Sequence, residues 1–327
     1  MWAVRDAGWP FKRLVAVCFL RHRSLLVQRA STLATAPTTG ESILAACHKR
    51  NIQVSSRTLH CEQFPDATLH EIKLDQAARG GTVLLYFHGG GYRNGIVGEG
   101  HVPVALDCAA AASASRLVFL EYTLAPESMY PGQLVQAARA LDVLLDEQHL
   151  RPSHIILGGD SAGGNLLLAL LAHLHDPAPG VPRIFGFGKE AGEAFKGVFL
   201  FSPWVTTSLA AASFRKNACR DYLDEIAVRM FLDFWKPRDE VWANILQAKE
   251  EFWATLPVAR MLVTVGEFEV FRDDVRSMAE KCSAGIGERL TFEISKQEVH
   301  VQAVVDRALG FPPTRSLVAH LEWLQGL

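Results

Sequence analysis

The stretch Ile155-Ile-Leu-Gly-Gly-Asp-Ser-Ala-Gly-Gly-Asn165 places a Gly-x-Ser-x-Gly motif directly after a buried, β-rich run and directly before an apolar segment of helical length. This strand-turn-helix context separates a functional motif from a chance match. At so sharp a turn the serine backbone is strained and its hydroxyl points outward, and only glycines on either side leave room for the chain to fold back. We therefore predict that Ser161 is a nucleophile, and we interpret Asp160 beside it as structural.

A second glycine-rich turn, His88-Gly-Gly-Gly91, follows another β-rich run. Bare glycine backbone lets N–H groups converge on the negative charge that develops on a carbonyl oxygen during acyl transfer. The expected donors are the N–H groups of Gly90, Gly91 and Ala162, the last because it follows the serine. His88 precedes the nucleophile and lies beside these donors, so we expect it to shape the loop and not to act as a base. The residues expected to shape the two turns are His88, Gly89, Gly159 and Gly163.

A histidine after the last β-like stretch is the candidate general base. His300 follows the run 290–294, so its imidazole can lie at the same carboxyl edge of a parallel sheet as Ser161. There it would take the serine proton and return it to the leaving group. The chain order of serine, acid and histidine excludes the chymotrypsin-like and subtilisin-like arrangements.

Four acidic residues are candidates for the partner of that histidine. Glu269 lies just past the β-rich run 261–265, where a carboxylate can accept the imidazole N–H. Asp273 and Asp274 fall in the first turn of the next helical segment, a position that favours acids on electrostatic grounds alone. Glu267 is the fourth candidate. We take Glu269 as the acid and leave the other three open.

The remaining chain alternates short apolar runs with helical segments, as strands buried on both faces and their crossover helices do. This order predicts an α/β fold with a mostly parallel, doubly wound sheet and right-handed crossovers. The predicted strands are 83–87, 117–120, 155–157, 198–201, 261–265 and 290–294. The predicted helices are 101–115, 132–149, 161–175, about 224–235 and 270–282.

Two stretches do not fit this alternation. We expect residues 1–65 to form a basic N-terminal segment with cap helices, and residues 66–327 to form the catalytic domain. Within that domain, the insertion at about 203–257 is rich in Trp and Phe. Aromatic clusters in such an insertion are typical either of plain core or of a lid over a pocket.

The first forty residues carry six basic side chains and one acidic one, a balance of +5. Their longest apolar run, 14–20, is far short of the roughly 20 residues that cross a bilayer. Arg21-His-Arg23 stands where a signal peptide needs small residues, so secretion is disfavoured. Three interpretations stay open: a cap helix over a pocket, peripheral membrane contact by residues 1–30, and mitochondrial targeting. The expected apolar face of the cap helix is Trp2, Trp9, Phe11 and Phe19.

Composition narrows the class of protein further. The chain has 327 residues, of which 49% are hydrophobic and 21% charged, as in ordinary folded globular proteins. A net charge of −2 provides no field that would attract nucleic acid. The six cysteines contain no Cys-x-x-Cys pair, so we expect reduced thiols in a cytoplasmic protein and no zinc site.

In these motifs the sequence resembles the hormone-sensitive-lipase-like branch of the α/β-hydrolases, also called α/β-hydrolase fold-3. The blocks that carry the resemblance are His88-Gly-Gly-Gly91, Gly159-Asp-Ser-Ala-Gly-Gly164, Glu121-Tyr-Thr-Leu-Ala-Pro-Glu127 and Glu298-Val-His300. The resemblance implies carboxylic ester hydrolysis and an N-terminal helical cap. Glu269 departs from the usual Asp, and Thr123 from the usual Arg. The stretch 265–274 looks similar to fungal steryl acetyl hydrolases and hydrolases of secondary metabolism.

The predicted function is that of a serine hydrolase, which cleaves short or medium acyl esters of a hydrophobic alcohol through an acyl-serine intermediate. We expect no metal or organic cofactor. Two alternatives remain open. The histidine and the oxyanion donors could instead promote condensation or cyclisation of a polyketide-derived intermediate, or the fold could be a non-catalytic ligand-binding homologue.

Overall fold

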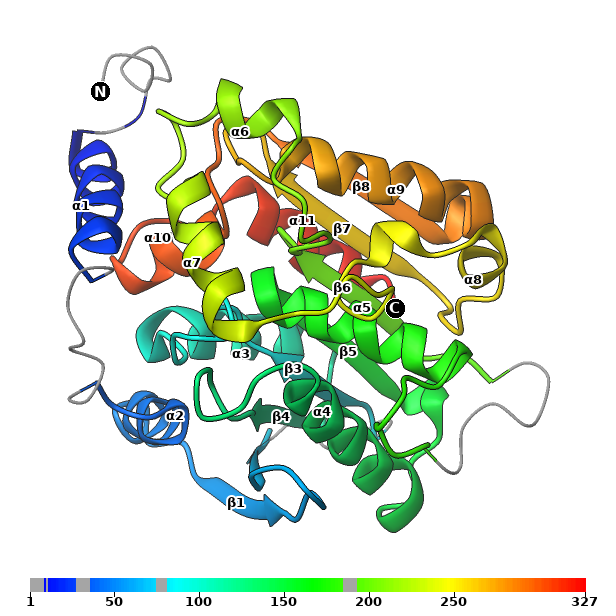
Figure 1. Ribbon diagram of the computed structural model, residues 1–327. Coiled ribbons are helices and arrows are strands. Elements are labelled where there is room, and N and C mark those ends of the chain that lie inside the picture. The colour runs from blue at the N-terminus through cyan, green and yellow to red at the C-terminus, as the bar shows by residue number, and fades with distance from the viewer. Residues whose placement is uncertain (1–8, 10, 28–35, 75–80, 185–192) are drawn as a thin grey trace.

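The computed structural model describes residues 9, 11–27, 36–74, 81–184 and 193–327, and an eight-stranded sheet runs through this part of the chain (Figure 1). The strand order is β1-β2-β4-β3-β5-β6-β7-β8. The strands are β1 (Val54–Leu59), β2 (Ala67–Lys73), β3 (Val83–Phe87), β4 (Arg116–Glu121), β5 (Ile155–Asp160), β6 (Gly197–Phe201), β7 (Met261–Gly266) and β8 (Leu290–Ser295).

The sheet is parallel from β4 through β3, β5, β6 and β7 to β8, and only β1 and β2 run antiparallel to their neighbours. All residues of β3, β5, β6 and β7 are buried, as expected of strands that are covered on both faces. The predicted α/β-hydrolase fold, with its mostly parallel doubly wound sheet, is confirmed.

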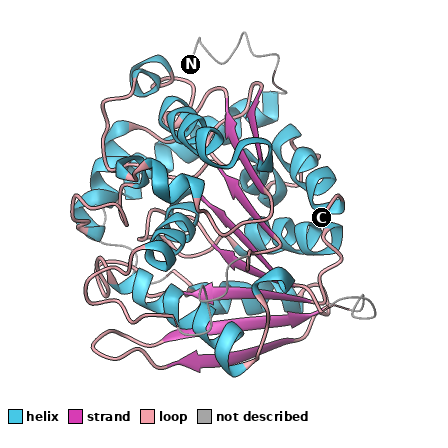
Figure 2. Ribbon diagram, turned by 90° about the vertical axis from the view of Figure 1, so that its right-hand side faces the viewer, coloured by secondary structure: helices cyan, strands magenta, loops and turns pink. Residues whose placement is uncertain are grey.

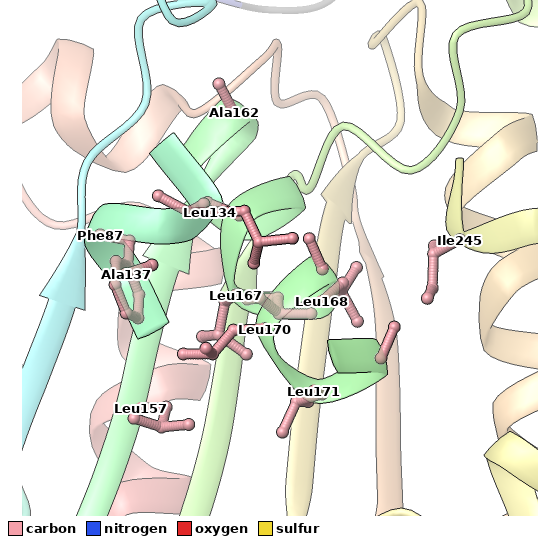
Figure 3. Packing of buried hydrophobic residues seen from close by; sticks show 14 of the residues in the cluster. Phe87, Leu134, Ala137, Leu157, Ala162, Leu167, Leu168, Leu170, Leu171 and Ile245 are labelled. Atoms are coloured by element: carbon pink, nitrogen blue, oxygen red, sulfur yellow. The ribbon is translucent and has the colours of Figure 1, made fainter. Parts of the chain in front are cut away.

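Helices cover both faces of the sheet, which Figure 2 shows nearly edge-on. On one face the apolar side chains of α4, α5 and α9 pack onto alternate strand residues such as Leu157, part of a cluster that Figure 3 shows around α5. On the other face α2, α3, α10 and α11 bury a second cluster against Leu84 and Phe199. The helices are α1 (Phe11–Val27), α2 (Thr39–His48), α3 (Gly98–Ala111), α4 (Gly132–Asp142), α5 (Ser161–His175), α6 (Ala212–Lys216), α7 (Glu225–Trp235), α8 (Glu250–Ala254), α9 (Arg272–Ile286), α10 (Gln302–Ala308) and α11 (Arg315–Gln325).

The register of the parallel strands aligns their carboxyl ends. Phe87 of β3 pairs with Gly159 of β5, and Asp160 pairs with Phe201 of β6. Farther along the sheet, Gly266 of β7 pairs with Ser295 of β8. Because each strand ends at the same edge, the loops that follow β3, β5, β6, β7 and β8 gather there.

The sheet begins at Val54, which lies inside the segment 1–65 that the sequence assigns to the N-terminal cap. Strand β1 was missed because four of its six residues are exposed and its sequence, VSSRTL, contains no apolar run. Strand β2 was also missed, and so were α10 and α11. The sheet therefore contains residues on both sides of the predicted boundary at residue 65.

Helix α1 lies beside α10 and packs on the loops that follow β7 and β8 (Figure 1). Its Val17, together with Trp9, forms a small apolar cluster with Phe268 and Val299. Phe11 and Phe19 of the expected apolar face, in contrast, are 77% and 64% exposed. Trp2 lies outside the described residues. None of the described helices combines the length and the apolar character that a membrane span requires.

Candidate active site

Ser161 stands at a tight turn between β5 and α5. Its backbone φ is +49°, in the left-handed region that costs a non-glycine residue conformational energy. A Cβ at Gly163 would lie 2.0 Å from the carbonyl oxygen of Phe87, and one at Gly159 would lie 2.8 Å from the carbonyl oxygen of Gly163. The turn therefore tolerates no side chain at either glycine, and the strained serine is held by the packing around it.

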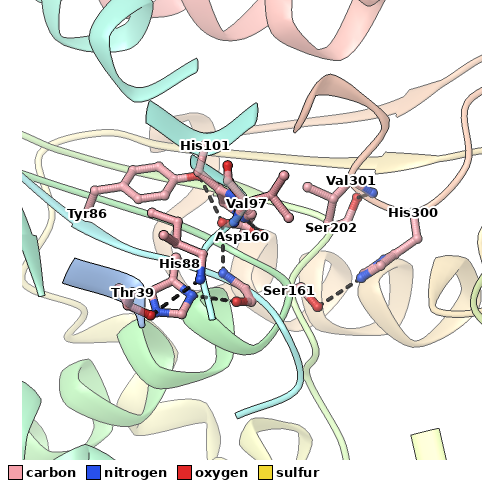
Figure 4. A network of polar contacts seen from close by, with 12 residues as sticks. Thr39, Tyr86, His88, Val97, His101, Asp160, Ser161, Ser202, His300 and Val301 are labelled. Atoms are coloured by element: carbon pink, nitrogen blue, oxygen red, sulfur yellow. Dashed lines mark hydrogen bonds and ion pairs between the residues drawn. The ribbon is translucent and has the colours of Figure 1, made fainter. Parts of the chain in front are cut away.

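A continuous relay joins this serine to an imidazole and a carboxylate. His300 Nε2 lies 2.8 Å from Ser161 Oγ, and His300 Nδ1 lies 2.9 Å from Glu269 Oε2 (Figure 4 shows the first contact). An ionised carboxylate only accepts, so Nδ1 carries the proton and Nε2 is free to accept the serine O–H. All three side chains are buried. The structure thus brings Ser161, His300 and Glu269 together as the sequence predicted.

Glu269 is held from the side opposite His300. Its Oε1 accepts hydrogen bonds from the hydroxyl of Ser202, which follows β6, and from the backbone N–H of Gly266. The other candidate acids are elsewhere. Asp273 and Asp274 lie in the first turn of α9, where Asp273 pairs with Arg272. Glu267 accepts the N–H of Gln297. Only Glu269 contacts the imidazole among these four carboxylates.

The surroundings of His300 favour its protonated form. Burial by itself lowers the pKa of this imidazole, but the hydrogen bond and charge of Glu269 oppose burial, and the charges of Asp221 and Asp160 add to them. The net result is that the pKa of His300 is raised above 6.5. Such a histidine is a strong proton acceptor for a neighbouring hydroxyl.

His88 has the opposite environment. Burial and the neighbouring His101 lower the pKa of His88 to about 4, so this imidazole is neutral. Its Nδ1 donates to the carbonyl of Gly89 at 2.6 Å, and its ring stacks on Tyr122 with the centroids 4.5 Å apart. It makes no contact with Ser161 in the described structure. This placement agrees with a residue that shapes the loop.

Asp160 ties the two glycine-rich turns together (Figure 4). Its carboxylate accepts the N–H of Gly89 and the hydroxyl of Tyr86, each at 3.0 Å, and it faces His101 Nε2 at 3.2 Å. Despite complete burial, which raises a carboxyl pKa, the pKa of Asp160 is lowered because His101 and these donors outweigh burial. A side chain at Gly89 would meet this carboxylate at 2.2 Å. The carboxylate therefore fixes the distance between the loop and Ser161.

The expected oxyanion donors lie around this junction. In the described part of the chain, the N–H groups of Gly90 and Gly91 have no hydrogen-bond partner, whereas the carbonyl of Gly90 accepts the N–H of Asn94. Both glycines have positive φ, +121° and +64°. The N–H of Ala162 lies in the first turn of α5, where a helix provides no acceptor. These three N–H groups are therefore free to donate to a ligand.

Ser202, Asn217 and Asp221 were missed by the sequence analysis. Ser202 had a usable signal, because it directly follows a predicted strand and so reaches the same sheet edge. Asn217 donates to the carbonyls of Glu267 and Glu269 at 3.1 and 2.7 Å, and Asp221 accepts two backbone N–H groups nearby. These two lie in the aromatic-rich insertion, far from any motif, where nothing in the sequence distinguishes them from surface polar residues.

A sequence profile of the alpha/beta hydrolase fold family matches residues 84–304. The chain belongs to this family. The resemblance to the hormone-sensitive-lipase-like, fold-3 branch that the motifs indicated is thereby confirmed, and the match spans the oxyanion loop, the serine turn, the acid and the histidine of this α/β-hydrolase.

Individual proteins that are similar to this chain are consistent with its membership of the family. An acetyl-hydrolase of Streptomyces hygroscopicus is 30% identical over 227 residues, which are 69% of this chain and 69% of that protein. A versiconal hemiacetal acetate esterase of Aspergillus parasiticus is 27% identical and covers 77% of this chain and 73% of its own. Carboxyl esterase 2 of the fungus Tuber melanosporum has a TM-score of 0.70 at 21% identity, covering 84% of this chain and 87% of that one, which is a likeness of fold.

Membership of this family and a buried serine–imidazole–carboxylate relay together make this α/β-hydrolase a carboxylic ester hydrolase.

The glycine at position 91 should be indispensable for activity. A Cβ there would lie 2.4 Å from the ring of Phe231 in α7, and φ is +64°. We expect Gly91→Ala to push the loop away from Ser161 and to lower kcat/KM for p-nitrophenyl butyrate by about 100-fold, the cost of losing one oxyanion donor. Gly81→Ala is the matched control, because Gly81 has the same φ of +64° but no atom within 4 Å of the added Cβ. Equal activity of the two variants would contradict this assignment.

Proposed function

We propose that Ser161 attacks the ester carbonyl and forms an acyl-serine, with His300 as the general base and Glu269 as its partner. The observation that carries this proposal is the unbroken relay of 2.8 and 2.9 Å contacts that ends on a serine with a strained backbone. As the serine oxygen bonds to the carbonyl carbon, its proton passes to His300 Nε2. Glu269 stabilises the imidazolium that forms.

As this bond forms, the carbonyl π electrons move onto oxygen, and the N–H groups of Gly90, Gly91 and Ala162 stabilise the oxyanion of the tetrahedral intermediate. The C=O bond then re-forms, the bond between the carbonyl carbon and the alcohol oxygen breaks, and the imidazolium gives its proton to that oxygen, which leaves as the alcohol. Water repeats the sequence on the acyl-serine: His300 takes a proton from the water, and the acid leaves as Ser161 regains its proton. Atoms and charge balance without a cofactor.

The proposed substrates are small esters of short or medium acids with a hydrophobic alcohol. Aromatic rings surround the relay: Phe271 lies edge-on to the imidazole at 5.1 Å, and Tyr222 lies at 6.1 Å. Phe231 covers Gly91, and the ring of Trp204 stacks on Phe271 with the centroids 6.1 Å apart. Such walls favour apolar ester groups. An acetyl-hydrolase among the relatives supports a short acyl group.

We further propose that α1, α2 and the insertion 203–257 form a cap over the site. Support comes from Val17 against Phe268 and Val299, the neighbours of the acid and the base, and from Phe231 over the oxyanion loop. The alternatives of a condensing enzyme and of a ligand-binding homologue are not favoured, because the relatives are esterases and the serine is joined to its base.

Ser161→Ala should abolish ester hydrolysis. Removing the nucleophile lowers kcat by up to about 10⁶-fold in enzymes of this type, whereas a base-driven condensation would not need the serine oxygen. An organophosphonate should label the wild-type protein once per chain and should fail to label S161A. Ser277→Ala, an exposed serine on α9, is the control and should keep full activity. Wild-type turnover by S161A would overturn the acyl-serine mechanism.

The pH profile should report the raised pKa of His300. Only the neutral imidazole accepts a proton, so the acidic limb of kcat/KM should lie above pH 6.5. Glu269→Gln removes the partner that raises this pKa, so the limb should move to lower pH while kcat falls by about 10³- to 10⁴-fold. Asp273→Asn is the control, because Asp273 does not touch the imidazole. Loss of activity in D273N with retention in E269Q would reverse the choice of acid.

We propose that the protein resides in the cytoplasm and contacts membranes peripherally through α1. All six cysteines are free thiols, which suits a reducing compartment. Phe11, Val15 and Phe19 are exposed at spacings of four residues and so form one apolar stripe, on the side of α1 opposite the buried Val17. Lys12 is exposed beside them, and the first forty residues are rich in basic side chains. Such a surface suits an anionic lipid layer.

Co-sedimentation with lipid vesicles tests the proposed contact of α1 with membranes. The full chain should co-sediment with phosphatidylserine-containing vesicles more than with phosphatidylcholine vesicles, and the double variant Phe11→Ser/Phe19→Ser should lose this binding. Val318→Ser, on α11, removes an exposed apolar side chain elsewhere and should bind like the wild type. Failure of the wild-type chain to sediment with either vesicle would contradict the proposed membrane contact. The proposed ester hydrolysis would not be affected by that result.

A further inference from the structure

Asp221 is a buried carboxylate beside the relay. The proposed steps of ester hydrolysis do not use it. It lies between α6 and α7 in the aromatic-rich insertion, and its side chain is 1% exposed. Its Oδ1 accepts the backbone N–H of His300 at 3.2 Å, and its Oδ2 accepts the backbone N–H of Val270 at 3.0 Å. One carboxylate thus bonds to the base residue and to the residue that follows the acid.

The two backbone groups belong to different loops. Val270 lies in the loop between β7 and α9, and His300 lies in the loop between β8 and α10. A carboxylate is suited to joining them, because each of its two oxygens accepts and both bonds are charge-assisted. An amide side chain at this position would offer only one acceptor oxygen.

The segment that carries Asp221 is itself fastened. Arg21 of α1 donates to the carbonyl oxygen of Asp221 at 3.2 Å. Four residues upstream, the side chain of Asn217 donates to the carbonyls of Glu267 and Glu269. Asp221 therefore contacts the two loops from a third segment, the one between α6 and α7. The contacts of Arg21 and Asn217 fix the position of that segment.

We infer that Asp221 is a positioning residue for the proposed hydrolysis: it clamps the acid-bearing and base-bearing loops at one spacing, and its negative charge stabilises the imidazolium of His300. This inference rests on the proposed function, since it assigns a role around the same relay. Asp221 does not touch the substrate or the reacting atoms, and it acts through the backbone and the field at His300.

The electrostatics agree with this geometry. The charges of three carboxylates act on the imidazole: Glu269 from the loop after β7, Asp221, and Asp160 from the end of β5. Burial raises the pKa of Asp221 to about 7, with the charge of Glu269 adding to burial and the charge of His300 opposing it. A proton on His300 therefore favours the ionised form of Asp221, and an ionised Asp221 favours the proton on His300.

The variant Asp221→Asn tests whether the charge of Asp221 contributes to the reaction in addition to its support of the two loops. The variant keeps the shape of the side chain but loses the charge and one acceptor, so kcat should fall by about 10- to 100-fold, as expected for a small displacement of catalytic groups, with little change in KM. The acidic limb of kcat/KM should also move to lower pH, because removing a negative charge near His300 lowers its pKa. Activities are normalised to the fraction of chains that an organophosphonate labels at Ser161.

Asn217→Ala is the matched comparison. Asn217 supports the acid-bearing loop from the same segment but carries no charge. Its loss should reduce kcat while leaving the acidic limb at the wild-type pH. An unchanged limb and unchanged kcat in a folded D221N would overturn the inference, and so would an equal shift of the limb in N217A. A wild-type chain that neither hydrolyses esters nor takes the label would instead overturn the proposed function.

The wild-type chain provides a second measurement that does not depend on how D221N folds. With ¹⁵N-labelled histidine, the His300 imidazole should titrate in two steps, because ionisation of Asp221 changes the field at the ring. A single-step titration of His300 would contradict the coupling between the two groups.

Discussion

The contact between Ser161 and His300 joins residues 139 positions apart, and it depends on the register of the parallel strands. The pairing of Phe87 with Gly159, of Asp160 with Phe201 and of Gly266 with Ser295 brings the carboxyl ends of five strands to one edge. A shift of one residue in any of these pairings would turn every side chain of the shifted strand to the other face of the sheet. The buried apolar strands that set this register are thus the foundation of the chemistry.

Two histidines at this edge have opposite electrostatic environments. His300 faces carboxylates and has a raised pKa, whereas His88 faces another imidazole and a carbonyl and has a pKa lowered to about 4. The difference comes from neighbours, since both rings are buried. The environment of each histidine therefore suits a different role. The more basic imidazole of His300 suits proton transfer from a serine, and the neutral imidazole of His88 suits the rigid support of an oxyanion loop.

The sequence was sufficient for the fold class and for the three groups of the relay, because each depends on a local pattern: an apolar run, a glycine-flanked serine, or a side chain just past a strand. It was insufficient where the determinant is a distant partner. Strand β1 is exposed along most of its length and takes its place only by pairing with β2. The buried state of Asp221 likewise depends on two loops and α1, which meet only in the folded chain.

The ring of Phe231 occupies the volume that a side chain at Gly91 would need, so the surroundings of the oxyanion loop are completed by α7 and not by the sheet. The surroundings of the loop and the positions of the reacting groups therefore depend on different elements. Substitutions on α7 can change the surroundings of this loop without disturbing the strand ends, whereas substitutions at the strand ends act on the reaction itself. The surroundings of the loop and the reacting groups thereby lie on different stretches of one polypeptide, which is an arrangement that directed evolution can exploit by randomising α7 alone.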